Sequence, residues 1–296
     1  RRWPKLALKV SQRFNAPKFF FTESAGDGER LAREAFQSGA QTVVAVGGDG
    51  TMNEVLNGYF DTTGAVINPE ASLGVLPMGT GSDLCRSVGV SRDPVEALSL
   101  LSEPPSHIDC GLVEVSEQRR YFGNIGSVGV SGEVAKYFEE HGKTGALSYI
   151  SGLFKAASNY QKRGFSLRFK TLDGEVVERE IPDAFISIFA KGRYFGGGMK
   201  IAPKSMLTNG SLQCVLVRGV SGLEIMRYLP SIFAGKHLKH PPFSSLIASE
   251  VELSVTHDSW IELDGEPALK VTPEERAIIK VLPSRVLFHL GSEAYR

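Results

Sequence analysis

The chain has 296 residues, of which 42% are hydrophobic and 22% charged, values that are typical of a folded globular protein and exclude a disordered one. Lysine plus arginine and aspartate plus glutamate both number 33, so the formal net charge of +0 argues against a protein that mainly binds nucleic acid. No apolar run reaches the ~18 residues of a membrane-spanning helix, and the three separated cysteines form no disulfide framework, so the cytoplasm is the expected compartment.

The N-terminal third of the chain alternates strand patterns with helix patterns. Short apolar and β-branched runs predict strands buried in a sheet, at 18–22, 42–46 and 73–77. Helices are predicted between and after them, at 27–37, 51–59 and 93–101. This alternation predicts a parallel sheet with helices on its faces. We expect an α/β domain over residues 1–107, with residues 285–296 packing back on it.

The pattern changes over residues 108–284. Many short strand-like runs follow one another, separated by Gly, Asn and Asp: 111–115, 120–125, 166–171, 184–190, 211–217, 250–255 and 278–282. Helical patterns interrupt them at 145–163 and 222–233. Such closely spaced runs predict a second domain, an antiparallel sandwich or barrel.

A glycine-rich segment, Gly47-Gly48-Asp49-Gly50-Thr51, separates a predicted buried strand from a predicted helix. Glycines let the backbone adopt positive φ values and approach a bulky ligand closely. The N–H groups at the start of the helix suit a phosphate. Because a carboxylate would repel a bare phosphate, Asp49 indicates a bound Mg²⁺.

A second loop repeats this pattern after the next predicted strand, with the sequence Met78-Gly79-Thr80-Gly81-Ser82-Asp83. Loops that follow neighbouring parallel strands converge at the carboxyl edge of the sheet, where ligands bind. The alternative is that both are simple turns that connect a strand to a helix, but an Asp at each helix entrance favours the ligand site.

A third candidate is the triplet Asp264-Gly265-Glu266. Asp-Gly is a strong signal for a β-hairpin turn, and such a turn can aim two acids into a single cleft. Phosphoryl transfer needs carboxylates for the metal ion and one proton acceptor for the attacking alcohol. The sequence leaves open which acid has which role.

These motifs resemble the diacylglycerol kinase catalytic-domain family, which includes bacterial YegS-like lipid kinases, sphingosine kinases and ceramide kinases. The resemblance rests on GGDGTMNE at 47–54 and GTGSDLCR at 79–86, and continues at 108–111, 122–124, 196–203 and 264–266. It implies an N-terminal three-layer α/β nucleotide-binding domain, a C-terminal antiparallel β-sandwich and an active site between them. It also implies transfer of the γ-phosphate of ATP to the hydroxyl of a diacylglycerol-like membrane lipid.

The resemblance assigns roles to individual residues. ATP contacts are implied for Thr22, Gly47, Gly48, Asp49, Gly50, Thr51, Asn53, Glu54, Gly79, Thr80 and Gly81. The Mg²⁺ ion of the nucleotide is assigned to Asp49, Asp83 and Glu266, and the catalytic residues are Asp264, Glu266 and Asp49, with Asp264 or Glu266 as the base. A weak structural Mg²⁺ site is implied at the side-chain oxygen of Asn209 and the backbone carbonyl oxygens of Met206 and Ser211.

The sequence departs from the family pattern at three places. No Asn-Pro-x-x-Gly loop precedes Lys18, and the chain begins with Arg1, so we expect either a preceding segment or a lost role for that loop. Ser82 stands where the family usually has Asn. Asn209 stands where the family has an acidic residue, which removes a charge and weakens the structural metal site.

Two segments are candidates for contact with the lipid. The pattern at 145–163 predicts either a core-facing helix or a flap over the lipid, and the aromatic and basic residues at 232–243 predict either headgroup docking or a solvated loop. The expected partners are a membrane lipid and the membrane surface, reached peripherally from the cytoplasm, and no nucleic acid; a homodimer is compatible with the sequence. Alternative functions are a sphingoid-base or ceramide kinase and a non-catalytic lipid-binding protein.

Overall fold

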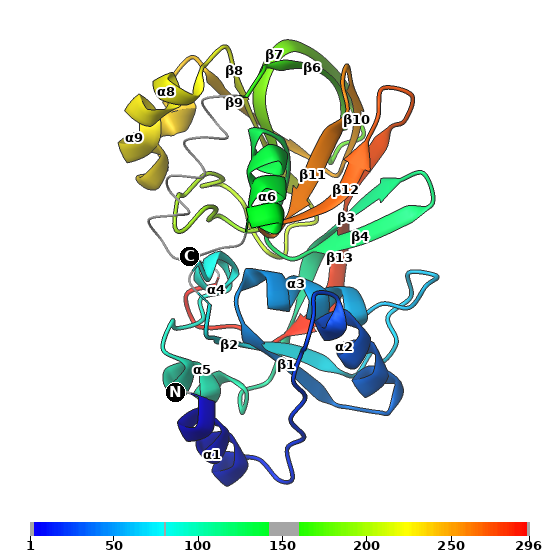
Figure 1. The fold of residues 1–296 in the computed structure, drawn as a ribbon, viewed down its shortest axis with the longest axis vertical. Helices are drawn as coiled ribbons and strands as arrows, with labels where there is room; N and C mark the ends of the chain where they lie inside the picture. The colour runs from blue at the N-terminus through cyan, green and yellow to red at the C-terminus, as the bar shows by residue number, and fades with distance from the viewer. Residues whose placement is uncertain (1–2, 80, 142–159, 295–296) are drawn as a thin grey trace. The chain divides into compact units, whose positions relative to one another are not determined.

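The structure is a computed structural model that describes residues 3–79, 81–141 and 160–294 (Figure 1). The chain forms two compact units. The first comprises Arg1–Ile108 and Arg285–Arg296, and the second comprises Asp109–Ser284. Most of the predicted helical pattern at 145–163 lies outside the described residues. Among the residues that are described, every helix is too short or too polar to span a bilayer.

The first unit is an α/β structure, as the alternating pattern predicts. Strand β1 (Thr42–Gly47) pairs with β2 (Ser72–Pro77) in parallel, from Thr42 opposite Ser72 to Gly47 opposite Pro77. Phe288, the last residue of β13 (Ala277–Phe288), pairs in parallel with Leu73 of β2. The helices of this unit are α1 (Trp3–Arg13), α2 (Asp27–Gln37), α3 (Asp49–Gly58), α4 (Asp83–Ser87) and α5 (Pro94–Leu100).

The strand predicted at 18–22 is wrong. The segment forms neither helix nor strand, and Phe20 and Phe21 are exposed. The ring of Trp3 in α1 instead packs edge to face against Phe19 and Phe21, at centroid distances of 5.3 and 6.0 Å. A run of phenylalanines satisfies β-propensity, but a strand also needs a neighbour for its backbone.

The second unit is built from antiparallel strands. They are β3 (Ser106–Val115, which begins in the first unit), β4 (Gln118–Phe122), β5 (Ile125–Gly129), β6 (Arg163–Lys170), β7 (Val176–Ala190), β8 (Leu212–Arg218), β9 (Phe243–Ala248), β10 (Glu250–Val255), β11 (Ser259–Leu263), β12 (Glu266–Val271) and most of β13. The pairing order runs β10-β6-β7-β5-β11-β12, and β8 pairs with both β7 and β9. Each predicted strand run of this half overlaps one of these strands, and the run at 120–125 is split into β4 and β5.

Helices cover part of this unit. They are α6 (Val130–His141), α8 (Gly222–Ile225), the 3₁₀ turn η1 (Met226–Tyr228), α9 (Leu229–Phe233) and the 3₁₀ turn η2 (His237–Lys239). The helix predicted at 222–233 is therefore present in three short pieces, and Pro230 stands in the first turn of the last piece. Figure 1 shows α6 lying across the strands of this unit.

The second unit has two apolar cores. One lies between strands and includes Phe165, Phe169, Leu253 and Ile279. The other core contains buried residues of β5, β7 and β8 that pack with Phe138 of α6 and Ile232 of α9. The cysteines of both units, Cys85, Cys110 and Cys214, are buried and free, as expected for a chain without a disulfide framework.

Gly111 of β3 lies opposite Phe122 of β4. A Cβ atom on Gly111 would lie 1.9 Å from the Phe122 ring. We expect Gly111→Ala to lower the free energy of unfolding by about 1–3 kcal/mol, because the ring has to leave its place. Urea denaturation measures the effect, with exposed Gln118→Ala as the control. An unchanged midpoint for Gly111→Ala would show that the ring does not pack on this backbone.

Candidate active site

Two glycine-rich loops meet at the carboxyl ends of β1 and β2. The N–H groups of Met78 and Gly79 donate hydrogen bonds to the carbonyl oxygen of Gly47, at 2.9 and 3.1 Å. A Cβ atom on Gly79 would lie 2.4 Å from Gly48 Cα, so only glycine permits this approach. The convergence of the two loops that the sequence predicts is confirmed.

Asp49 is the first residue of α3 and connects the two loops. Its Oδ2 atom accepts a hydrogen bond from the N–H of Asp83, and its Oδ1 atom accepts one from the N–H of Leu84, both at 3.1 Å. These N–H groups belong to the first turn of α4 and have no partner within that helix. A carboxylate has about four acceptor positions, so Asp49 retains the capacity to bind a cation as well.

The start of α3 carries the features of a phosphate-binding turn. Gly48 precedes the helix in an extended conformation, and the first N–H groups of α3 lack carbonyl partners within the helix. Close contacts also require glycine here: a Cβ on Gly47 would lie 2.5 Å from Thr51 Oγ1, and one on Gly81 would lie 3.0 Å from Asp49 Oδ2.

Asp83 is buried and its charge is compensated within its own loop. Arg86 donates a hydrogen bond to Asp83 Oδ1 at 2.7 Å and another to the carbonyl oxygen of Gly81 at 2.6 Å. A nucleotide-bound metal ion would therefore share this carboxylate with an arginine. Ser82, just before Asp83, adopts a left-handed conformation with φ of 53°, which Asn tolerates better than Ser.

Other predicted ATP contacts have structural partners. Glu54 accepts hydrogen bonds from the N–H groups of Gly26 and Gly28, at 2.9 and 2.8 Å, and so holds the start of α2. Asn53 is buried, and its carbonyl oxygen accepts from Asn57 Nδ2 at 2.8 Å. Thr22 is exposed in the segment before α2. The predicted contact at Thr80 lies outside the described residues.

The predicted hairpin at residues 264–266 is confirmed. Strands β11 and β12 pair antiparallel up to Leu263 opposite Glu266, and Asp264 and Gly265 form the turn with φ values of 51° and 95°. Positive φ at both central residues is the geometry that favours Asp-Gly in a two-residue hairpin.

The Asp264 carboxylate holds the segment between β4 and β5. It accepts three backbone hydrogen bonds, from the N–H groups of Gly123, Asn124 and Ile125, at 2.9, 3.0 and 2.9 Å. The N–H of Asp264 also donates to the carbonyl oxygen of Ile125 at 2.9 Å. The Asp264 carboxylate therefore fixes two chain segments that are far apart in sequence to each other.

Glu262 is a functional candidate that sequence reasoning missed. It is buried in β11, where its carboxyl group accepts hydrogen bonds from Ser127 Oγ and from the N–H of Gly265. Burial raises the pKa of Glu262 to about 8, and the charges of Asp264 and Glu266 add to the shift. No local signal in the sequence marks Glu262, because its partner Ser127 lies 135 residues away along the chain.

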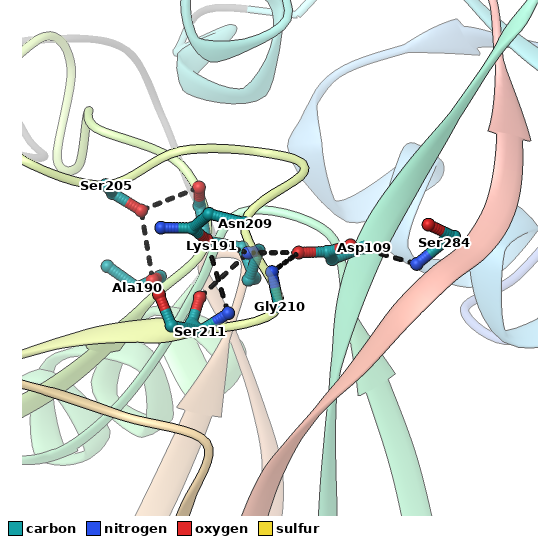
Figure 2. A network of polar contacts seen from close by, with 8 residues as sticks. All are labelled: Asp109, Ala190, Lys191, Ser205, Asn209, Gly210, Ser211 and Ser284. Carbon is teal, nitrogen blue, oxygen red and sulfur yellow. Dashed lines mark hydrogen bonds and ion pairs between the residues drawn. The ribbon is translucent and has the colours of Figure 1, made fainter. Parts of the chain in front are cut away.

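The structural Mg²⁺ site that the resemblance implies does not fit the structure, because a lysine side chain lies there. The Nζ atom of Lys191 donates hydrogen bonds to Asn209 Oδ1 at 3.2 Å and to the carbonyl oxygen of Ser211 at 2.8 Å, and it forms an ion pair with Asp109 at 2.8 Å (Figure 2). Burial lowers the pKa of Lys191, and the ion pair with Asp109 opposes this shift. Two of the three predicted ligands, Asn209 Oδ1 and the carbonyl oxygen of Ser211, therefore already accept from an ammonium group, so the residues present do not fit a metal ion.

Within the described ranges, no three His, Cys, Asp or Glu side chains gather where they could hold a metal ion. Magnesium at a nucleotide site usually takes one or two carboxylates and several phosphate and water oxygens. Asp49 and Asp83 are the carboxylates that the two glycine loops carry in the first unit, and the N–H of Asp83 donates to Asp49 Oδ2.

Family models match almost the whole chain. The model described as "Diacylglycerol kinase catalytic domain" matches residues 1–113, and that described as "YegS C-terminal NAD kinase beta sandwich-like domain" matches residues 124–287. A "Probable lipid kinase YegS-like" of Chromohalobacter salexigens is 33% identical over 83% of this chain and 76% of its own length. The chain belongs to the diacylglycerol kinase and YegS-like lipid kinase family.

Further comparisons show one more similar sequence and two similar folds. A "Diacylglycerol kinase" of Bacillus subtilis is 27% identical over 83% of this chain and 77% of its own length. The crystal structure of a diacylglycerol kinase from Bacillus anthracis matches at a TM-score of 0.64 and 18% identity, covering 93% of this chain and 85% of that chain. A second structure from the same bacterium reaches a TM-score of 0.75 at 21% identity, covering 98% and 91%.

The family confirms the predicted fold class and the prediction of a kinase. An N-terminal catalytic domain is followed by a β-sandwich domain, in the order that the motifs predict. Two of the three departures from the lipid kinase pattern have structural correlates. Ser82 occupies a left-handed position that suits the family's usual Asn, and Asn209 faces a lysine.

We expect the stability of this lipid kinase to depend on pH through Glu262. Its pKa of about 8 in the folded protein lies above the ordinary value of 4.5, so the folded state keeps a proton that the unfolded state releases. The stabilisation is complete below the ordinary pKa and is lost as the pH rises toward the folded pKa. Glutamine has no proton to release, so the free energy of unfolding of Glu262→Gln does not fall in this way. As the pH rises from about 5 to 8, it should come to exceed that of the wild type by a few kcal/mol.

Urea denaturation across this pH range measures the difference. The control is Glu178→Gln, whose side chain is 73% exposed. Parallel pH profiles for the wild type and Glu262→Gln would contradict the buried, protonated state of Glu262.

Proposed function

We propose that this protein is an ATP-dependent lipid kinase that transfers the γ-phosphate of ATP to the hydroxyl of a diacylglycerol-like membrane lipid. The observation that carries the proposal is the contact between the two glycine loops, with Asp49 joined to both at the start of α3. The family membership supports it, since relatives are named lipid kinase and diacylglycerol kinase.

The first unit supplies the nucleotide side of the proposal. The N–H groups at the start of α3 suit phosphate oxygens, because the helix dipole places partial positive charge there. Asp49 and Asp83 would hold Mg²⁺, which neutralises charge on the phosphates during transfer. Glu54 supports this turn indirectly, because it anchors α3 to α2.

The acidic hairpin supplies the base, and the environments of its three acids separate their roles. Asp264 is occupied by three backbone N–H groups, and Glu262 is buried and bound to Ser127. Glu266 is partly exposed at the first position of β12. We therefore assign proton acceptance from the lipid hydroxyl to Glu266, with Asp264 and Glu262 as positioning residues for the turn.

The segment 232–243 supports peripheral contact with a membrane only in part. Ile232, His237 and Phe243 are buried. Phe233 is 52% exposed, and Lys236, Lys239 and His240 are exposed as well. Each cation near an anionic surface contributes about 1 kcal/mol to binding. The homodimer and the lack of a nucleic-acid partner stay predictions from the sequence.

We expect Glu266→Gln and Asp264→Asn to fail in different ways. Glu266→Gln lowers kcat about 10²- to 10⁴-fold, the usual contribution of a general base, and leaves the unfolding midpoint unchanged. Asp264→Asn also lowers the free energy of unfolding by about 2 kcal/mol, because a charged acceptor of backbone N–H groups is lost. Labelled-phosphate transfer and urea denaturation measure the two effects, with exposed Glu274→Gln as the control. Full turnover by Glu266→Gln would exclude Glu266 as the base.

The substrate proposal is tested with γ-labelled ATP and micelles of diacylglycerol, sphingosine or ceramide. We expect labelled phosphatidic acid from diacylglycerol, loss of product when Mg²⁺ is withheld, and at least about 100-fold weaker turnover for Asp49→Asn, which removes the charge facing the metal. Gly79→Ala should abolish ATP binding because its Cβ separates the loops.

Label confined to sphingosine or ceramide would reassign the substrate. Lipid binding without ATP consumption would indicate a non-catalytic lipid-binding protein.

A further inference from the structure

A buried lysine lies at the centre of a polar cluster in the second unit. Lys191 follows the end of β7, and its side chain is 0% exposed. Its ammonium group donates three hydrogen bonds, to Asp109 Oδ2, Asn209 Oδ1 and the carbonyl oxygen of Ser211 (Figure 2). Three donors meet three acceptors, so the full capacity of the ammonium group is used.

The carboxylate of Asp109 extends the cluster. It is 1% exposed, and it also accepts hydrogen bonds from the N–H of Gly210 at 2.8 Å and from the N–H of Ser284 at 2.9 Å. The backbone of Lys191 contributes as well, because its carbonyl oxygen accepts from Ser205 Oγ at 2.7 Å. One lysine and one aspartate thus connect β3, the end of β7, the 209–211 loop and β13.

The ammonium group uses the oxygens that a divalent ion would need. Mg²⁺ binds oxygen ligands at about 2.1 Å and prefers carboxylates. Here Asn209 contributes a neutral amide, and Asp109 is already compensated by Lys191. A divalent ion on Asn209 and Ser211 would lie close to a buried positive charge, where repulsion is strong because water does not screen it.

We propose that the ammonium group of Lys191 replaces a divalent cation in this cluster, so that the 209–211 loop is held without any metal ion. The charges of Lys191 and Asn209 fit a cluster without a metal ion. The lysine supplies the positive charge internally, and the neutral amide avoids a second buried carboxylate beside Asp109. The cluster is a fixed structural cation site, and any dependence of the protein on Mg²⁺ belongs to the nucleotide and not to the fold.

The first test uses the wild-type protein without nucleotide. We expect the same Tm in excess EDTA and in excess MgCl₂, and no equimolar Mg²⁺ or Ca²⁺ by native mass spectrometry. A Tm that falls in EDTA would overturn the proposal, as would one retained divalent ion per chain. The measurement is repeated with Asp49→Asn, so that a metal ion at the glycine loops is not mistaken for one at Lys191.

The second test rebuilds the metal site. Lys191→Ala leaves Asp109 buried without its counterion and should lower Tm by about 10 °C. The double variant Lys191→Ala with Asn209→Asp should recover part of this loss in MgCl₂ or CaCl₂ and lose it again in EDTA. Asn209→Asp alone keeps the ammonium group and should show no response to metal.

The two tests are independent of kinase activity, so a failed function proposal leaves them unaffected. A double variant that folds and binds no divalent ion would show that the ammonium group does not stand at a cation position. If the double variant does not fold, the metal content and Tm of the wild type decide the question.

Discussion

The close approach of two backbone segments is the constraint on which the nucleotide side of this protein depends. Gly79 comes so near to Gly48 that a single Cβ atom would lie 2.4 Å from the opposite Cα. The approach lets one carboxylate, Asp49, reach the N–H groups at the start of the neighbouring helix. Two separate strand-to-helix turns thereby become one polar surface that displays N–H groups and carboxylates together. Kinase chemistry needs that combination, because phosphate oxygens and a metal ion have to be bound side by side.

The acidic hairpin shows how environment separates identical chemical groups. Asp264 accepts hydrogen bonds from three backbone N–H groups, Glu262 is buried with its pKa raised, and Glu266 is partly exposed. The buried acid avoids a second negative charge beside Asp264, and both fixed groups determine the position of the turn. The third acid, Glu266, is the one that is partly exposed to solvent. A division of roles among neighbouring carboxylates therefore follows from burial and hydrogen bonding.

Local patterns predicted the strand and helix order well, since the elements around both glycine loops depend on short-range signals. Helix α2 has the predicted bounds, α5 lies within the predicted helix 93–101 and begins after the capping residue Asp93, and the Asp-Gly turn forms a hairpin. The strand predicted at 18–22 failed because strand formation needs a partner for its backbone, and the Phe19 and Phe21 rings pack on Trp3 instead. Gly47 and Thr51 belong to one turn, so the need for glycine at position 47 is a local feature. The partners of Glu54, in contrast, lie 26 to 28 residues away, and no local pattern indicates them.

By itself, the sequence determined the two-domain order, the two phosphate-type loops, the acidic turn and the resemblance to lipid kinases, because each of these lies in a short contiguous segment. Only the tertiary structure decided what Lys191 and Glu262 do. Lys191 meets Asp109 across 82 residues of chain, and Glu262 meets Ser127 across 135. Burial removes water from both groups, so their charges depend on partners that folding brings together. Folding thereby places the ammonium group of Lys191 where the family pattern implied a metal ion.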